Sequence, residues 1–356
     1  MATVFIGAAG EMCRVAVERF ATVSDAPIVL ADINVTALES LAAKLPAGRA
    51  SIKKLDLFDK SSLNETIRGA ALVVLGAGPY MRTSEPVLKA CLAAKVPYLD
   101  FDDDVQSTLA ALDLQEQSMP EFHATLGVVE TTYAPMLGEE GETLLHETAH
   151  PEPVTLPRIF PTAKRIRCAG ALGPAPFNGI ARGLGQADPS TDGLGTMFRE
   201  MTAAFRGGDI TVKELFQLVG QVSHSLSPWR YALYGMIKTI WTGECTTGEV
   251  LSFLVNSARG KRVENKGSLL VRAVGLRNGH PATITKRTAK SGEHTFLSKT
   301  MGTVTGTATA AFMLLALEDG LSRSGVYCPE DWAEPKRFYH ALERLGSPKD
   351  ELVITL

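Results

Sequence analysis

A glycine turn near the start of the chain carries the clearest chemical signal. Residues 3–6 read TVFI, a run typical of a buried strand, and residues 7–10 read GAAG, after which apolar residues recur at helical spacing. A strand that enters a helix through such a turn directs backbone N–H groups and the positive end of the helix toward one point, where a pyrophosphate binds. The third glycine usual in this pattern is replaced by Cys13. The pattern predicts a dinucleotide site made by Gly7, Ala8, Ala9, Gly10, Glu11 and Met12.

An acidic residue follows the second predicted strand, residues 27–31. Asp32 lies 22 positions after Gly10, and Ile33 comes directly after it. A carboxylate at this position accepts hydrogen bonds from the adenosine ribose and repels a 2′-phosphate. No arginine occurs in residues 33–35. We therefore assign Asp32 and Ile33 to the cofactor site and expect NAD(H) to be favoured over NADP(H). The alternative is that Asp32 only caps the next helix.

Further candidate residues follow the later strands. Asp56 and Leu57 end the third predicted strand, 50–57, and Ala77, Gly78 and Pro79 follow the fourth, 71–75. We assign all five to the cofactor site because the carboxyl ends of parallel strands open onto one edge of the sheet. Asp102 follows the fifth strand, 97–101, and Glu130 and Tyr133 follow the sixth, 124–129. The neutral phenol of Tyr133 is our first candidate proton donor. Asp102 is the second, as a partner for a substrate ammonium, although the run of three aspartates could instead cap the next helix.

The elements that position these residues alternate regularly. Helical patterns at 11–21, 35–45, 61–67, 84–95 and 105–118 separate the six predicted strands. Helices of this length between strands imply parallel pairing with right-handed crossovers. The fold class expected is α/β, with an N-terminal Rossmann-type doubly wound sheet.

Residues 76–104, GAGPYMRTSEPVLKACLAAKVPYLDFDDD, resemble the saccharopine dehydrogenase-like family, as do GAAGEM at 7–12 and SGVYCPEDW at 324–332. The resemblance implies an NAD(P)-dependent oxidoreductase whose AGP turn passes beside the nicotinamide ribose. It would place Gly78, Pro79 and Tyr80 near the reacting ring, and Tyr80 becomes a third catalytic candidate. Beyond the sixth strand, residues 128–135 depart from the family's glycine-rich turn, and this departure leaves the substrate open.

The reaction implied by the resemblance is hydride transfer to or from a C=N bond of a small-molecule imine or secondary amine. Two alternatives stay open: reduction of an activated C=C bond, as in trans-acting enoyl reductases, and a non-catalytic sensor that binds NAD. Fold alone does not decide between them.

The rest of the chain is expected to form a mixed α+β domain. Helical patterns occupy residues 193–206, 212–222, 229–241 and 248–258, and residues 268–276 and 282–286 flank Asn278-Gly279, a hairpin signal. Strands are also expected at 166–172 and 297–300, and the apolar helix at 304–317 should return to the first domain. The expected division is 1–130 for the dinucleotide-binding domain, 131–300 for substrate binding and dimerisation, and 301–356 for the returning segment.

Composition excludes several classes. The net charge is -3 and the basic stretches are short, which argues against nucleic acid as a partner. Five scattered cysteines indicate reduced thiols and a cytoplasmic protein. No apolar run reaches the ~20 residues that span a bilayer. The first predicted strand begins at residue 3, so we expect no signal peptide. His146 and His150 form an HExxH pattern, but prolines follow at once, and no metal site is expected. The hairpin around Asn278-Gly279 and the aromatic residues in 229–241, together with the family resemblance, indicate a homodimer, although the aromatic residues could instead belong to the core.

Overall fold

The computed structural model describes residues 1–114, 132–135, 142–147, 150–171, 174–184, 227–261, 270–287, 301–320, 325–347 and 354–355. Its first part is a five-stranded parallel sheet in the order β3-β2-β1-β4-β5, and this order confirms the predicted doubly wound fold. The strands are β1 (Thr3–Ile6), β2 (Ile28–Asp32), β3 (Ala50–Lys54), β4 (Leu72–Leu75) and β5 (Tyr98–Asp100). The sixth strand predicted at 124–129 lies outside the described residues.

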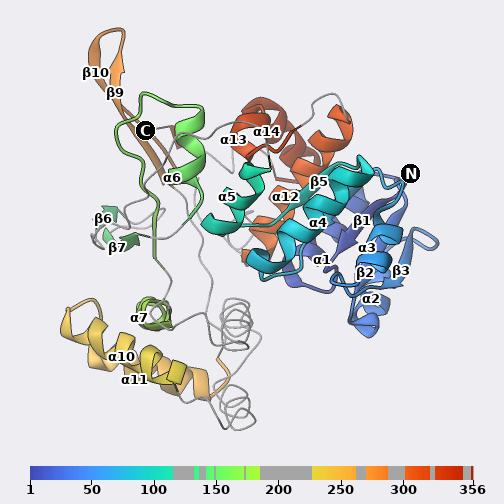
Figure 1. Ribbon diagram of the computed structural model, residues 1–356. Coiled ribbons are helices and arrows are strands. Elements are labelled where there is room, and N and C mark those ends of the chain that lie inside the picture. The colour runs from blue at the N-terminus through green and yellow to red at the C-terminus, as the bar shows by residue number, and fades with distance from the viewer. Residues whose placement is uncertain are drawn as a thin grey trace.

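Helices cover both faces of this sheet (Figure 1). They are α1 (Glu11–Val23), α2 (Val35–Ala42), α3 (Lys60–Ile67), α4 (Tyr80–Ala94) and α5 (Val105–Asp113). Alternate residues of β1 enter two separate cores: Phe5 packs with α1 and α2, whereas Val4 and Ile6 pack with α3 and α4. Because both faces are buried, the strand is apolar throughout.

A late segment of the chain completes the first of these cores. It comprises α12 (Met301–Asp319), α13 (Pro329–Trp332) and α14 (Pro335–Arg344). α12 packs along α1, and the two helices run in the same direction. A Cβ on Gly302 would lie 2.6 Å from Glu11 Oε1, and one on Gly306 would lie 2.5 Å from the Met12 carbonyl oxygen. Two glycines therefore allow α12 to approach the N-terminal end of α1 closely.

The remaining elements include two small antiparallel sheets. One consists of β6 (Thr132–Pro135), β7 (Glu142–Glu147) and β8 (Ala169–Gly170), and α6 (Glu152–Thr155) lies between the last two strands. The strand predicted at 166–172 is thus reduced to two residues, because only Ala169 and Gly170 pair with β7. The other sheet joins β9 (Leu270–Arg277), β10 (His280–Arg287) and β11 (Ile354–Thr355). The predicted hairpin is confirmed, since Asn278 and Gly279 both have positive φ.

Three helices form a cluster of their own, drawn at the lower left of Figure 1. They are α7 (Pro176–Leu184), α10 (Ser227–Trp241) and α11 (Thr247–Ala258), and the last two confirm sequence predictions. The helices predicted at 193–206 and 212–222, and the strand predicted at 297–300, lie outside the described residues. Among the helices that the structure describes, none has the length and apolar character needed to cross a membrane.

Candidate functional site

The glycine turn has the geometry of a cradle for phosphate. Gly7 has φ +77°, and a Cβ there would lie 2.5 Å from the Ala77 nitrogen, so only glycine fits. The Gly7 N–H donates to the Ala31 carbonyl (2.8 Å), which fixes the turn against the end of β2. Gly10 is the N-cap of α1 and supplies no side-chain cap. The start of this helix therefore presents its backbone N–H groups without a capping side chain, as phosphate binding at a helix N-terminus requires.

The close contact between helix and strand uses a glycine that sequence reasoning did not single out. Cys13 replaces the third glycine of the pattern, and its side chain is buried against Gly76. A Cβ on Gly76 would lie 2.6 Å from the Cys13 Cβ. Gly76, directly after β4, thus provides the space that a glycine at position 13 would otherwise provide. Burial raises the pKa of the Cys13 thiol, so the thiol stays neutral.

Asp32 is tied directly to the glycine turn. Its Oδ2 accepts a hydrogen bond from the Ala9 N–H (3.1 Å), and its Oδ1 accepts one from the Asn34 N–H (2.9 Å). Asn34 itself caps α2 by accepting from the Ala37 N–H (3.1 Å), so the alternative role of Asp32 as helix cap is wrong. The carboxylate is held in place by two backbone donors, and each oxygen keeps acceptor capacity for a ligand.

The neighbourhood of Asp32 contains one cation that the sequence analysis missed. Ile33 is 69% exposed, and Asp32 is paired in register with Lys54 of β3. Side chains of residues paired in register on neighbouring strands point to the same face of the sheet. Lys54 thus lies on the same face of the sheet as the proposed ribose-binding carboxylate, and its side chain is exposed.

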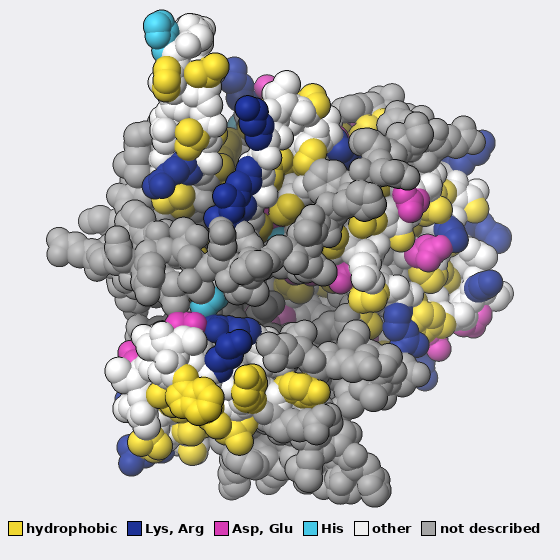
Figure 2. Space-filling view, turned by 60° about the vertical axis from the view of Figure 1, so that its left-hand side comes forward, with side chains coloured by type: hydrophobic (Ala, Val, Ile, Leu, Met, Phe, Trp, Pro, Cys, Tyr) yellow, Lys and Arg dark blue, Asp and Glu magenta, His cyan; other side chains and the backbone are white. Residues whose placement is uncertain are grey.

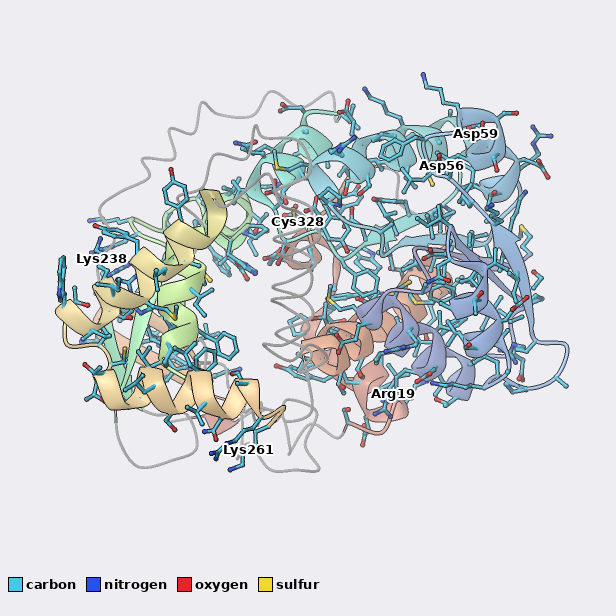
Figure 3. The ribbon with its side chains drawn as sticks, turned by 90° about the horizontal axis from the view of Figure 1, so that it is seen from below. Arg19, Asp56, Asp59, Lys238, Lys261 and Cys328 are labelled. Carbon is cyan, nitrogen blue, oxygen red and sulfur yellow. The ribbon has the colours of Figure 1, made fainter. Side chains whose placement is uncertain are left out.

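Asp56 and Leu57 lie in the connection from β3 to α3. Asp56 Oδ1 accepts from the Phe58 N–H (3.0 Å), and Asp59 caps α3 by accepting from the Ser61 N–H (3.0 Å). Figure 3 shows Asp56 and Asp59 beside each other at this connection. Leu57 packs against the core shared by α3 and α4. Hydrogen bonds from backbone N–H groups to Asp56 and Asp59 thus fix the conformation of this turn.

The turn after β4 brings the second group of predicted residues to the same edge of the sheet. Ala77 lies against Gly7, and its carbonyl accepts from Thr83 Oγ1 (2.6 Å). Pro79 is the N-cap of α4. Tyr80, the first residue of α4, packs against both cores, and burial together with nearby carboxylates raises the pKa of its phenol. Tyr80 is therefore neutral over the physiological range.

A cluster of acids follows β5. Asp100 accepts from the Tyr98 hydroxyl (2.7 Å), and burial raises the pKa of its carboxyl. Asp102 accepts from Ser84 Oγ (3.4 Å) and from the Asp104 N–H (2.9 Å). Burial raises the pKa of Asp102 to about 6, a value at which a carboxyl exchanges protons readily near neutral pH.

The question of which aspartate caps α5 is settled by its geometry. Asp104 is the N-cap and accepts from the Ser107 N–H (2.9 Å), so Asp102 is not needed for that task. Ser107 Oγ in turn donates to the Tyr80 carbonyl (3.3 Å), which joins α5 to the turn after β4. The structure therefore brings Tyr80 and Asp102 together, and it adds Tyr98, Asp100 and Ser84, which were not predicted as site residues.

Tyr133 is placed only through its backbone. It lies in β6, paired with Leu144 of β7. Its side chain and the whole of Glu130 lie outside the described residues. A separate hollow, between the start of α7 and one face of α11, is lined by Pro176, Phe253 and Asn256 among others, none of them a predicted site residue.

Residues 3–125 match the family described as the saccharopine dehydrogenase NADP binding domain. Over the whole chain, the fold is similar to that of apo saccharopine dehydrogenase (L-Glu forming) from Saccharomyces cerevisiae, with 12% identity, a TM-score of 0.50, and 100% of this chain and 99% of that chain covered. Residues 3–125 are thus similar to a saccharopine dehydrogenase NADP binding domain, and the whole chain has a similar fold. This confirms the predicted resemblance, and the matched region is an NAD(P)-binding domain of this type.

Other solved structures match part of the chain. Triphenylmethane reductase from Citrobacter sp., complexed with NADP(H), is 18% identical over 28% of this chain and 36% of that one, with a TM-score of 0.25. An NADPH-dependent quinone oxidoreductase from Escherichia coli is 21% identical over 27% and 33%, with a TM-score of 0.23. The chain thus spans about a third of the length of these two proteins. No curated protein matches it.

Proposed function

We propose that the chain is an NAD(P)-dependent oxidoreductase that transfers a hydride to or from the C=N bond of a small-molecule imine or secondary amine. The observation that carries this proposal is the hydrogen bond from the Ala9 N–H to Asp32, which joins a phosphate-type turn to a ribose-type acid. The residues fit a dinucleotide, because Gly7 lets the turn close against Ala77 and Gly10 leaves the backbone N–H groups at the start of α1 without a capping side chain. When bound, the nicotinamide supplies or accepts the hydride, and the chain supplies orientation and a proton.

The cofactor we propose is NAD(H), with Asp32 as the discriminating residue. The carboxylate, held by two backbone donors, accepts hydrogen bonds from the ribose hydroxyls and repels a 2′-phosphate. Lys54, on the same face of the sheet, favours the phosphate, and the matching family is described as NADP binding. The repulsion by Asp32 outweighs the attraction by Lys54, because Asp32 is fixed at the turn whereas a lysine at the surface is mobile and hydrated.

Proton transfer is assigned to the edge of the sheet that carries β4 and β5. Reduction of an imine adds a hydride at carbon and a proton at nitrogen. Tyr133 remains our first candidate donor, and Asp102 is the second. Asp102 has a pKa of about 6 and a fixed carboxyl, which suit it to hold a substrate ammonium or to return a proton. Tyr80 is proposed to position the ring rather than to titrate, because its phenol is buried and neutral.

The reaction class is tested by cofactor turnover. NADH oxidation is followed with paired amines and keto acids and, separately, with conjugated enals, and NAD⁺ reduction is followed with secondary amines. Turnover with the first set supports the proposal, whereas turnover with enals alone supports C=C reduction. Tight NADH binding without turnover in any set would support a non-catalytic sensor and contradict the proposal.

The proton donor is tested by two variants and a matched control. Tyr133→Phe and Asp102→Asn each remove one proton-transferring group, and loss of such a group costs roughly 10²–10⁴ in rate. Asp103→Asn removes an exposed neighbouring carboxylate and should leave the rate unchanged. Whichever of the two variants keeps full turnover with intact cofactor affinity is removed from the mechanism.

Assembly is proposed from the exposed apolar residues of α10. We propose a cytoplasmic homodimer that uses the outer faces of α10 and α11. Leu233, Ile237 and Trp241 recur at i, i+4 and i+8 on α10, and all three are exposed. Figure 2 shows apolar side chains gathered at the lower left of the molecule, where these helices lie. Exposed apolar patches of this kind mark interaction sites.

A further inference from the structure

Three potential metal ligands of different kinds meet beside α6. His150 precedes this helix, Glu152 is its first residue, and Cys168 directly precedes β8. One imidazole nitrogen, one carboxylate oxygen and the sulfur all lie within 4.8 Å of one another. The side chains of His150 and Glu152 are 40% and 37% exposed, and Cys168 is partly buried. An ion can therefore reach the group from solvent.

The HExxH pattern in the sequence does not account for this group. His146 lies in β7, a strand, and its imidazole faces the buried pair of Arg182 and Glu244. Only His150 of the pattern joins the cluster, and the other two ligands come from positions that the pattern does not include. His146 and His150 therefore do not form a metal-binding pair on a helix. His150 lies instead beside Glu152 and Cys168.

We propose that His150, Glu152 and Cys168 bind one Zn²⁺ ion. Zinc takes sulfur, nitrogen and oxygen ligands in tetrahedral geometry at roughly 2.0–2.3 Å, so its ligand atoms lie roughly 3.3–3.7 Å apart. The ligand atoms of the cluster lie within 4.8 Å of one another, so none needs to move by much more than about 1 Å, and the hydrogen-bonded His150 and Glu152 would separate slightly to share the ion. A mixed thiolate, imidazole and carboxylate set favours zinc over Mg²⁺ or Ca²⁺, which prefer oxygen alone.

Two further carboxylates lie near the cluster, and Arg167 precedes Cys168 in the chain. The carboxylates of Asp103 and Glu330 both interact electrostatically with the His150 imidazole. Glu330 Oε1 accepts from Thr155 Oγ1 (3.1 Å), whereas its buried Oε2 has no hydrogen-bond partner in the described part of the chain. A buried carboxylate oxygen without a donor is costly unless a cation lies nearby. Arg158, which pairs with the neighbouring Asp331 (3.1 Å), supplies part of the positive charge near Glu330, and a bound cation would add to it.

The ligand count defines the type of site. Three protein ligands leave a fourth tetrahedral position for water or a small molecule, as in zinc sites that bind substrates rather than in closed structural sites. His150 and Glu152 are hydrogen-bonded to each other, which holds two of the three ligands side by side. Asp103 follows β5, so the ion would lie on the side of the molecule that carries the proposed reaction centre. The metal proposal itself does not depend on the proposed oxidoreductase activity.

Metal binding is tested on the full chain after removal of bound metal with a chelator. Titration with Zn²⁺ by calorimetry should give one ion per chain, and Co²⁺ should give the near-ultraviolet absorption of a cobalt–thiolate bond. Cys168→Ser should abolish that absorption and weaken Zn²⁺ binding by at least about tenfold. His150→Gln and Glu152→Gln should weaken Zn²⁺ binding by a similar factor. His340→Gln and His280→Gln, at exposed sites elsewhere, are the controls and should change neither signal.

A second measurement uses the unmodified chain and needs no variant to fold. Zn²⁺ should slow alkylation of Cys168 by iodoacetamide, measured by mass spectrometry of the digested protein, and should leave the rate at Cys245 unchanged. Less than one ion bound per chain at micromolar Zn²⁺, or cobalt absorption that survives in Cys168→Ser, would overturn the proposal. Equal alkylation of Cys168 with and without zinc would do the same.

Discussion

At the scale of single residues, the two most informative side chains are those of Asp32 and Asp102. For each of them, another residue caps the helix that follows. Asn34 caps α2 and Asp104 caps α5, so neither Asp32 nor Asp102 is the cap of the helix that follows it. The sequence alone could not assign these roles, because any residue in a run such as DDD can occupy the N-cap position. The phosphate turn was predictable, since a strand, two glycines and a helix follow one another without a gap.

Replacing Asp32 by Ala should shift cofactor choice toward NADP(H). The repulsion of the 2′-phosphate disappears and the ribose hydroxyls lose their acceptor, so the ratio of NADPH to NADH affinity should rise by roughly tenfold. Lys54→Ala is the matched opposite and should weaken NADPH binding without affecting NADH. Fluorescence titration of both cofactors measures the ratio. Tighter binding of NADPH than NADH by the unaltered protein would contradict our assignment.

Replacing Asp102 by Asn should stabilise the protein at alkaline pH. The pKa of this carboxyl is raised from 3.8 to about 6 in the folded protein. Between these two pH values the native state therefore binds more protons than the unfolded state. Stability therefore falls as the pH rises through that window, and the neutral amide avoids the loss. We expect a gain of about 1 kcal/mol at about pH 8, after allowance for partial solvation, and none near pH 4.

Urea unfolding at the two pH values measures this difference. Asp103→Asn, which changes an exposed carboxylate in the same run, should change the stability little at either pH. A gain for Asp102→Asn that is independent of pH would mean that packing, rather than the charge, is responsible.

At the scale of elements, glycine decides how the helices meet. In the pair of α7 and α10, a Cβ on Gly183 would lie 1.9 Å from the Tyr231 carbonyl oxygen, and one on Gly235 would lie 2.0 Å from that of Gly179. The backbones of these antiparallel helices are therefore in direct contact. Ion pairing supports the packing, since Arg182 of α7 forms a bidentate pair with Glu244 after α10.

The Gly183→Ala variant should destabilise the cluster of α7, α10 and α11. The added methyl group meets backbone, which cannot move aside, and overpacking of this kind costs roughly 1–3 kcal/mol. Gly248→Ala in α11 is the control, because its Cβ would meet only Thr246 Oγ1 at 3.8 Å and alanine favours a helix. Thermal unfolding followed by circular dichroism should show a lower midpoint for Gly183→Ala alone. Equal unfolding midpoints for Gly183→Ala and the unaltered protein would mean that α7 and α10 can move apart without loss of stability.

These contacts also show where prediction from sequence stops. The helices of residues 11–113 were predictable because apolar residues recur at helical spacing, as Cys13, Val17 and Phe20 do in α1. The hairpin was predictable from Asn278-Gly279. The pairing of α12 with α1 had no directional signal, because α12 is apolar on nearly every side. Contacts between glycines distant in the sequence leave no local pattern either.

At the scale of the whole molecule, the proposed division into 1–130, 131–300 and 301–356 separates three kinds of structure. The first carries the parallel sheet, the second carries the two antiparallel sheets and the α7, α10 and α11 cluster, and the third carries α12 to α14. Strand β11, Ile354–Thr355, pairs with β10 and so returns to the middle part. The boundaries themselves remain a proposal.

A charge on the outer face of α10 should dissociate the proposed homodimer. Trp241 is 80% exposed and Leu233 is 55% exposed, so the double variant Leu233→Glu and Trp241→Glu should fold normally. Light scattering at micromolar concentration should then give the mass of one chain, where the unaltered protein gives two. Phe160→Glu, at an exposed apolar site elsewhere, should remain dimeric. A single-chain mass for the unaltered protein would remove the homodimer.

The packing of α12 on α1 has a consequence for how the chain is made. Ala310, Met313 and Leu314 share one core with Phe5 and Phe20, yet they are synthesised after the entire middle of the protein. At typical translation rates, roughly ten to forty seconds separate the end of α5 from the start of α12. During that interval the core beside α1 and α2 lacks its last helices. The apolar side chains that α12 later covers stay exposed near the ribosome exit, where a chaperone that shields extended apolar segments would find its first substrate.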